Sequence, residues 1–130
     1  MSTFASDLPL AMEMSDVAAR IALQHFDPSG IAFDSKSDGS PVTTVDKTTE
    51  RALRKYIAKY RPDDAIVGEE FGASGKASRI WYLDPIDGTA NYAAGQTKWG
   101  SLITLVADSR PSAPKLLSSR RTWLRKWGRT

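Results

Sequence analysis

Two stretches of the chain carry apolar residues at the spacing of an amphipathic helix. The apolar face of the first helix consists of Leu10, Met14, Val17, Ala18, Ile21 and Ala22. The second predicted helix covers residues 46–60, and its apolar face consists of Leu53, Tyr56, Ile57 and Tyr60. We expect Ser6 or Asp7 to cap the first helix and Thr43 or Thr44 to cap the second, because short polar side chains accept hydrogen bonds from the first free amides.

The other apolar runs are short and separated by turn residues, as strands are. A hairpin is predicted over residues 31–45, with a polar, glycine-containing tip at 36–41. Further strands are predicted at 65–68, 79–83 and 102–106. We expect residues 72–75 to form a flexible loop and residues 90–98 to form a connection of small residues. Helices that precede a sheet of mostly buried strands predict a layered α+β domain.

Length and composition fit a single soluble domain. The chain has 130 residues, of which 41% are hydrophobic and 25% are charged. It contains no cysteine, which excludes disulfides and thiolate metal sites. Asp7, Glu13 and Asp16 interrupt the N-terminal segment, so we expect neither a signal peptide nor a membrane span, and we predict a cytoplasmic protein.

The positive net charge belongs to one end of the chain. Residues 109–130 hold seven basic and no acidic residues, and without those seven the formal charge of +3 becomes −4 for residues 1–108. The arginines around Trp123 and Trp127 can be interpreted as a patch that binds nucleic acid. We expect no nucleic-acid partner, because residues 1–108 carry a net negative charge and the tail has no amphipathic pattern.

Two carboxylates three residues apart, Asp84 and Asp87, follow an apolar strand and flank Pro85. Alternation along a strand would send them to opposite faces, but a proline interrupts the ladder, so both can converge on one point. Glu69 follows the preceding strand and adds a third carboxylate. Such oxygen ligands suit a hard divalent cation such as Mg²⁺, and the Ile86 carbonyl is a further donor.

Hydrolysis of a phosphate ester also needs an activated water and a cradle for the phosphate. Thr89 can orient a water whose proton Asp46 accepts, and the Gly88 and Thr89 amides can hold phosphate. Lys36, on the hairpin tip, can close over the site. Asp87 is the natural candidate to bridge two metal ions, because it adjoins the Gly-Thr step.

These residues lie in three ordered motifs, at 38–46, 68–70 and 81–89, which read DGSPVTTVD, GEE and WYLDPIDGT. Over residues 8 to about 108 the chain resembles the inositol monophosphatase family of Mg²⁺-dependent, Li⁺-sensitive phosphatases. The segment 95–105, GQTKWGSLITL, is similar to the histidinol-phosphatase branch of that family. The resemblance implies the N-terminal lobe of a sugar-phosphatase-like layered α/β fold, and histidinol phosphate as the substrate. It leaves inositol 1-phosphate and 3′-phosphoadenosine 5′-phosphate open.

The resemblance also implies roles for individual residues. The implied metal ligands are Glu69, Asp84, Asp87 and the Ile86 carbonyl, for two or three Mg²⁺ ions or for Mn²⁺. The implied catalytic residues are Asp46, Thr89 and Lys36, and the implied substrate-binding residues are Asp87, Gly88 and Thr89. The expected binding partner is a small phosphorylated metabolite, and no membrane association is expected. A homodimer is left open.

The chain departs from the family beyond residue 108. Members run to roughly twice this length, and an aspartate in their second half completes the metal site. We interpret residues 109–130 as a non-native tail that follows a frameshift near residues 110–112, and we expect weak or no turnover. The alternative to an enzyme is a fragment that binds metal without catalysing a reaction.

Several of these residues also have simpler interpretations. Asp84 and Asp87 can be turn residues, since aspartate next to proline and glycine favours turns. Lys36 can be an ordinary surface lysine, and Thr89 can be a helix cap. We interpret Glu70 as a solvated or supporting acid and leave it out of the metal ligands. His25, the only histidine, is expected to be a residue of the last helical turn.

Overall fold

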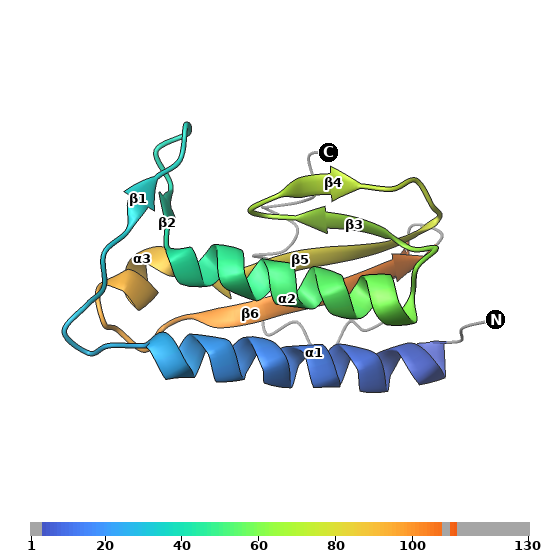
Figure 1. Cartoon of the computed structure of the whole chain (residues 1–130), viewed down its shortest axis with the longest axis horizontal. Coiled ribbons are helices and arrows are strands. Elements are labelled where there is room, and N and C mark those ends of the chain that lie inside the picture. The colour runs from blue at the N-terminus through green and yellow to red at the C-terminus, as the bar shows by residue number, and fades with distance from the viewer. Residues whose placement is uncertain (1–3, 108–109, 112–130) are drawn as a thin grey trace.

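Two long helices cover one face of a five-stranded sheet (Figure 1). The computed structural model describes residues 4–107 and 110–111. The helices are α1 (Phe4–His25), α2 (Thr44–Tyr60) and α3 (Thr89–Ala93). The strands are β1 (Asp34–Ser35), β2 (Pro41–Val42), β3 (Ala65–Gly68), β4 (Gly72–Ser74), β5 (Arg79–Asp87), β6 (Gly100–Ala107) and β7 (Arg110–Pro111). The layered α+β prediction is confirmed.

The main sheet has the strand order β4-β3-β5-β6-β7. Only β3 and β5 run parallel, and every other neighbouring pair in this sheet is antiparallel. Helix α1 packs on β6 and α2 packs on β5. The separate β1–β2 hairpin and the short α3 lie together near the N-terminal end of α2 (Figure 1). That end of the molecule is where the predicted catalytic residues gather.

The core between the helices and the sheet is built from both predicted apolar faces. Its buried members are Leu10, Ala11, Met14, Ala18, Leu53, Ile57, Ile66, Trp81, Leu83, Ile103 and Leu105. Side chains alternate between the two faces of a strand, so every second residue faces the helices, as Trp81 and Leu83 of β5 do. Among the described residues, no helix is both long and apolar enough to cross a bilayer.

The prediction that Ser6 or Asp7 caps α1 is wrong, because the helix already includes Phe4. Asp7 instead lies in the first turn with a buried side chain. Its Oδ1 accepts hydrogen bonds from Arg61 Nε at 2.8 Å and Arg79 Nη2 at 2.9 Å. Burial disfavours the charge of Arg79, but its bonds to Asp64 and Asp7 outweigh this and raise its pKa. Asp7 therefore joins α1 to the end of α2 and the start of β5.

Two loop predictions and one strand boundary need correction. Gly72–Ser74 is not a flexible loop but strand β4, which pairs with β3 and extends the sheet edge. Residues 90–93 belong to helix α3, because Gly88 at φ 91° reverses the chain and lets a helix begin at Thr89. Strand β5 does not stop at residue 83 but continues to Asp87.

A bulge, rather than a turn, brings the two aspartates to one side of the sheet. Asp84 pairs with Leu102 and Asp87 pairs with Gly100, so two residues of β5 oppose one residue of β6. The Ser101 hydroxyl donates to the Pro85 carbonyl at 2.6 Å inside this bulge. Because residues 100 and 102 point to the same face of β6, Asp84 and Asp87 share a face too.

Most of the tail that we interpret as non-native lies outside the described residues. Both tail tryptophans and all but one of its basic residues are in that part. The described part is Arg110–Pro111, which pairs with Val106 and Ala107 as β7. The sheet therefore includes two residues beyond the boundary at 108.

Leu53→Ala tests the helix–sheet core. Leu53 is fully buried, so its truncation leaves a cavity and lowers the free energy of unfolding by about 2–5 kcal/mol. Leu23→Ala is the matched control, since Leu23 is 63% exposed and its truncation changes stability by no more than about 0.5 kcal/mol. Urea unfolding measures both, and equal losses would contradict the packing described here.

Candidate active site

The hairpin tip is held in shape by its own polar groups. Lys36 N donates to Ser40 O at 2.8 Å, and Gly39 N donates to Lys36 O at 2.9 Å. The Asp38 carboxylate accepts from the Ser40 amide at 2.9 Å and from its hydroxyl at 2.6 Å. The hydrogen bonds from Ser40 lower the pKa of Asp38. The tip is therefore a closed turn that presents Lys36 at its base.

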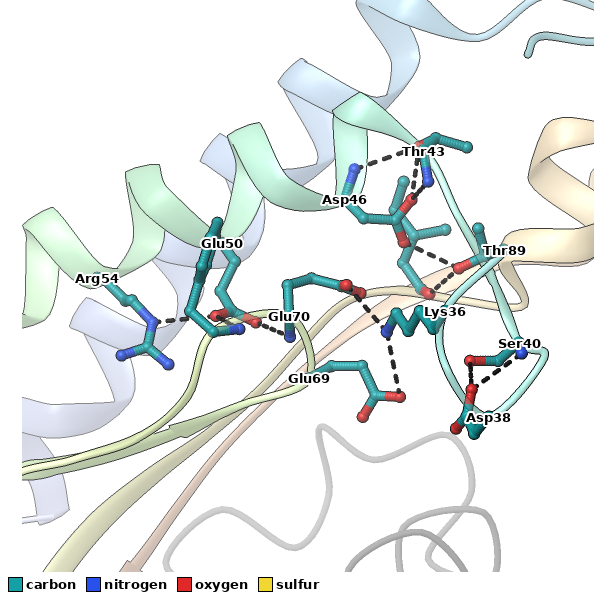
Figure 2. Close-up of polar contacts among 12 residues, drawn as sticks. Lys36, Asp38, Ser40, Thr43, Asp46, Glu50, Arg54, Glu69, Glu70 and Thr89 are labelled. Carbon is teal, nitrogen blue, oxygen red and sulfur yellow. Dashed lines mark hydrogen bonds and ion pairs between the residues drawn. The ribbon is translucent and has the colours of Figure 1, made fainter. Parts of the chain in front are cut away.

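Lys36 points from the hairpin to the acids that follow β3 (Figure 2). Its Nζ lies 2.9 Å from Glu70 Oε2 and 3.9 Å from Glu69 Oε1. The Glu70 side chain is only 3% exposed, and this burial raises its pKa, although Lys36 opposes the rise. The ammonium group thus compensates an acid that has been taken out of water.

Asp46 and Thr89 meet across the start of α2. Asp46 is fully buried, and its Oδ1 accepts a hydrogen bond from the Thr89 hydroxyl at 2.9 Å. Its Oδ2 accepts from the Thr43 amide at 2.8 Å and the Thr43 hydroxyl at 2.5 Å. The Asp46 amide donates to Thr43 Oγ1 at 3.3 Å, which completes a capping box. Thr43 is therefore the cap, one of the two residues predicted. The Thr89 hydroxyl also lies 3.0 Å from the Ile86 carbonyl.

Tyr92 anchors helix α3 to α1 and to the segment before β6. This side chain is fully buried, and its hydroxyl donates to the Ala22 carbonyl at 2.7 Å. Its ring meets Trp99 edge-on, with ring centroids 5.0 Å apart. Thr89, at the other end of this short helix, is therefore held in place by α1 and by the segment before β6.

A cavity of about 230 Å³ opens between the hairpin, the end of β3 and the start of α3. Its lining includes five predicted site residues: Lys36, Glu69, Ile86, Gly88 and Thr89. Asp87 lines the adjoining cavity of about 350 Å³, which Gly88 also lines. Asp84 lines neither cavity and is almost fully buried.

Glu69 and Asp84 each follow one member of a residue pair on the adjacent strands β3 and β5. The Glu69 amide donates to the Leu83 carbonyl at 3.0 Å, so Glu69 follows β3 beside the place where Asp84 follows Leu83 in β5. Within residues 4–107 and 110–111, no group of three or more acidic or histidine side chains is close enough to hold a metal ion. The donor chemistry fits Mg²⁺, because the residues offer only carboxylates and a carbonyl.

Two residues of this region escape the sequence prediction. Glu50 is fully buried beside the turn after β3, and Tyr92 holds α3. Glu50 does carry a signal, because it lies three residues before Leu53 on the apolar face of α2. A charged residue on an apolar helix face is buried only when it is paired, so its position indicates a structural partner.

The profile of the inositol monophosphatase family matches residues 5–113. The chain belongs to the inositol monophosphatase family. Its motifs at 38–46, 68–70 and 81–89 all lie within the matched region. The match also includes α1 from its second residue on, both hairpin strands and the whole of the main sheet.

Among relatives in the family, a histidinol-phosphatase of Mycobacterium tuberculosis is 40% identical over 123 residues, covering 90% of this chain and 46% of the relative. A histidinol-phosphatase of Streptomyces coelicolor is 38% identical over 106 residues, covering 82% and 40%. A solved inositol monophosphatase of Zymomonas mobilis is 41% identical with a TM-score of 0.67, covering 85% and 42%. The chain thus spans less than half the length of these relatives.

Thr43→Ala tests the cap that orients Asp46. The substitution removes the hydroxyl from the capping box, so the free energy of unfolding falls by about 1 kcal/mol. Thr43→Ser keeps the hydroxyl and retains most of that stability, as urea unfolding will show. Equal losses for both variants would mean that the methyl group, rather than the hydroxyl, stabilises the start of α2.

Proposed function

We propose that this chain carries the N-terminal half of a metal-dependent phosphate monoester hydrolase that acts on histidinol phosphate. The hydrogen bond from the Thr89 hydroxyl to Asp46 Oδ1, at 2.9 Å, is the observation that carries the proposal. It joins a buried carboxylate to a hydroxyl that lines the same cavity as Lys36 and Glu69.

Glu69, Asp84, Asp87 and the Ile86 carbonyl are the proposed metal ligands. The oxygen-only donor set and the bulge that turns both aspartates to one face support this assignment. Bound Mg²⁺ or Mn²⁺ supplies a Lewis acid for the phosphate and lowers the pKa of a water. Glu69 would have to exchange its 3.9 Å contact with the Lys36 ammonium group for the cation in order to act as a ligand.

Thr89 and Asp46 orient and deprotonate the attacking water in this proposal. The Thr89 hydroxyl gives its hydrogen to Asp46, which leaves the oxygen lone pairs free to accept a hydrogen bond from water. Asp46 keeps its orientation because Thr43 holds the other carboxylate oxygen through two hydrogen bonds. The pair therefore needs no rearrangement before it takes the proton.

The Gly88 and Thr89 amides and the Lys36 ammonium group are the proposed phosphate contacts, and Asp87 contacts the substrate. Gly88 at φ 91° reverses the backbone beside the cavity, and a Cβ there would lie 2.8 Å from the Lys98 carbonyl oxygen. Only glycine therefore gives this backbone path. Lys36, Gly88 and Thr89 line one cavity and Asp87 lines the adjoining one, which supports a small phosphorylated metabolite as substrate.

The substrate assignment depends on the relatives. Two relatives near 40% identity are histidinol-phosphatases, and segment 95–105 is similar to that branch. Inositol 1-phosphate is the second candidate, since a structure 41% identical to the chain is an inositol monophosphatase. A fragment that binds metal without turnover is the third, because the matched relatives are more than twice as long as the part they share with this chain.

Thr89→Ala tests the water-activating pair. We expect the rate of Mg²⁺-dependent phosphate release from histidinol phosphate to fall at least about 100-fold, because the hydroxyl that bonds to Asp46 is lost. Thr89→Ser keeps the hydroxyl and retains activity within about tenfold of the parent chain. Release is measured under single-turnover conditions, which detect the weak turnover we expect.

The matched control is Thr48→Ala. It removes an exposed threonine two residues after Asp46 in α2, and we expect it to leave phosphate release unchanged. Phosphate release that continues in a chelator would contradict metal dependence. Mg²⁺ binding by calorimetry without any release would favour the non-catalytic alternative. Faster release from inositol 1-phosphate would replace histidinol phosphate as the substrate.

A further inference from the structure

One buried carboxylate beside the candidate active site has no part in the proposed chemistry. Glu50 lies in the middle of α2, and its side chain is fully buried. Its carboxylate accepts hydrogen bonds from the Glu70 amide at 2.8 Å and the Phe71 amide at 2.9 Å (Figure 2). It also pairs with Arg54 Nε at 3.0 Å. Four oxygen lone pairs thus serve three donors.

Those two amides belong to the three-residue turn that joins β3 to β4. The first amide of the turn, from Glu69, continues the sheet ladder by donating to the Leu83 carbonyl at 3.0 Å. The next two amides, from Glu70 and Phe71, bond to Glu50 instead. The fully buried Glu50 carboxylate is costly unless it is hydrogen-bonded, so its bonds to these two amides fix the path of the turn after Glu69.

The neighbouring glycine makes room for this carboxylate. A Cβ at position 68 would lie 2.6 Å from Glu50 Oε1 and closer still to its carboxyl carbon. Gly68 is thus required by the close approach of Glu50. Arg54 adds a second hold, because its guanidinium group also bonds to the Gly72 carbonyl and to Ser74 Oγ in β4.

We infer that Glu50 is a positioning residue for Glu69. Its buried carboxylate fixes the Glu70 and Phe71 amides, and this aims the Glu69 side chain at the candidate metal site. The Glu69 amide is bonded to β5, and the next two amides of the turn are bonded to Glu50 in α2, so the backbone that carries the Glu69 side chain is fixed on both sides. This inference rests on the proposed function, in which Glu69 is a metal ligand.

Glu50→Gln in the full chain is the test. The carboxamide keeps the shape of the side chain, but it replaces one acceptor oxygen with an NH₂ group that cannot accept from a backbone amide. We expect hydrogen exchange of the Glu70 and Phe71 amides to become at least tenfold faster. We expect Mn²⁺ affinity, measured by calorimetry, to fall about 10- to 100-fold, as is typical when a residue that orients a ligand is lost.

Gly68→Ala is a second route to the same state. The three atoms nearest to the added methyl group all belong to the Glu50 carboxylate, so the substitution displaces that group and should reproduce the exchange and affinity changes. Leu53→Ala is the stability control, because it opens a cavity one turn further along the same helix. We expect it to lower the melting temperature while Mn²⁺ affinity stays within twofold. Glu69→Gln removes the ligand itself and gives the reference loss.

The outcomes separate this inference from the proposed function. Unchanged exchange of the two amides in Glu50→Gln overturns the inference, whatever the metal does. Faster exchange with unchanged Mn²⁺ affinity overturns it too, if Glu69→Gln does lose affinity. If the parent chain binds no Mn²⁺, or Glu69→Gln binds it unchanged, the proposed metal ligands are wrong and the role of Glu50 falls with them.

Discussion

A carboxylate taken out of water must be paired or fully hydrogen-bonded, and this requirement determines the layout around the ends of β3 and β5. Asp46, Glu50 and Glu70 all have buried side chains. Each has a different kind of partner: Thr43 and Thr89 for Asp46, Arg54 and two amides for Glu50, and the Lys36 ammonium for Glu70. The hairpin, α2, α3 and the β3–β4 turn are therefore joined through acids rather than through apolar contacts alone.

Much of the fold could be predicted from sequence because its elements have strong local signals. The apolar face of α2 and the hydroxyl of Thr43 identify a helix and its cap, and both are present. The segment 65–68 is short, apolar and followed by acids, and it forms β3. The Asp46–Thr89 contact could also be predicted, since both residues belong to recognisable motifs.

The features that sequence reasoning missed depend on contacts between distant segments. Gly72–Ser74 has the composition of a loop, but pairing with β3 makes it a strand. Asp7 has the character of a cap, yet Arg61 and Arg79 use its carboxylate inside the helix. Glu50 is an ordinary helix former whose importance depends on amides about twenty residues away. Its place on the apolar face of α2 indicates a partner, but no local pattern identifies these two amides as that partner.

Two of the polar clusters of α2 lie at opposite ends of the helix, one around Asp46 and one around Arg61. Fifteen helical residues separate them by about 22 Å. At that distance two unit charges interact by less than about 1 kcal/mol at an effective dielectric constant near 20, and physiological salt weakens this further. A change of charge at the Asp46 end, such as the cation binding proposed above, therefore has little electrostatic effect at the other end, where Arg61 and Asp7 anchor α1.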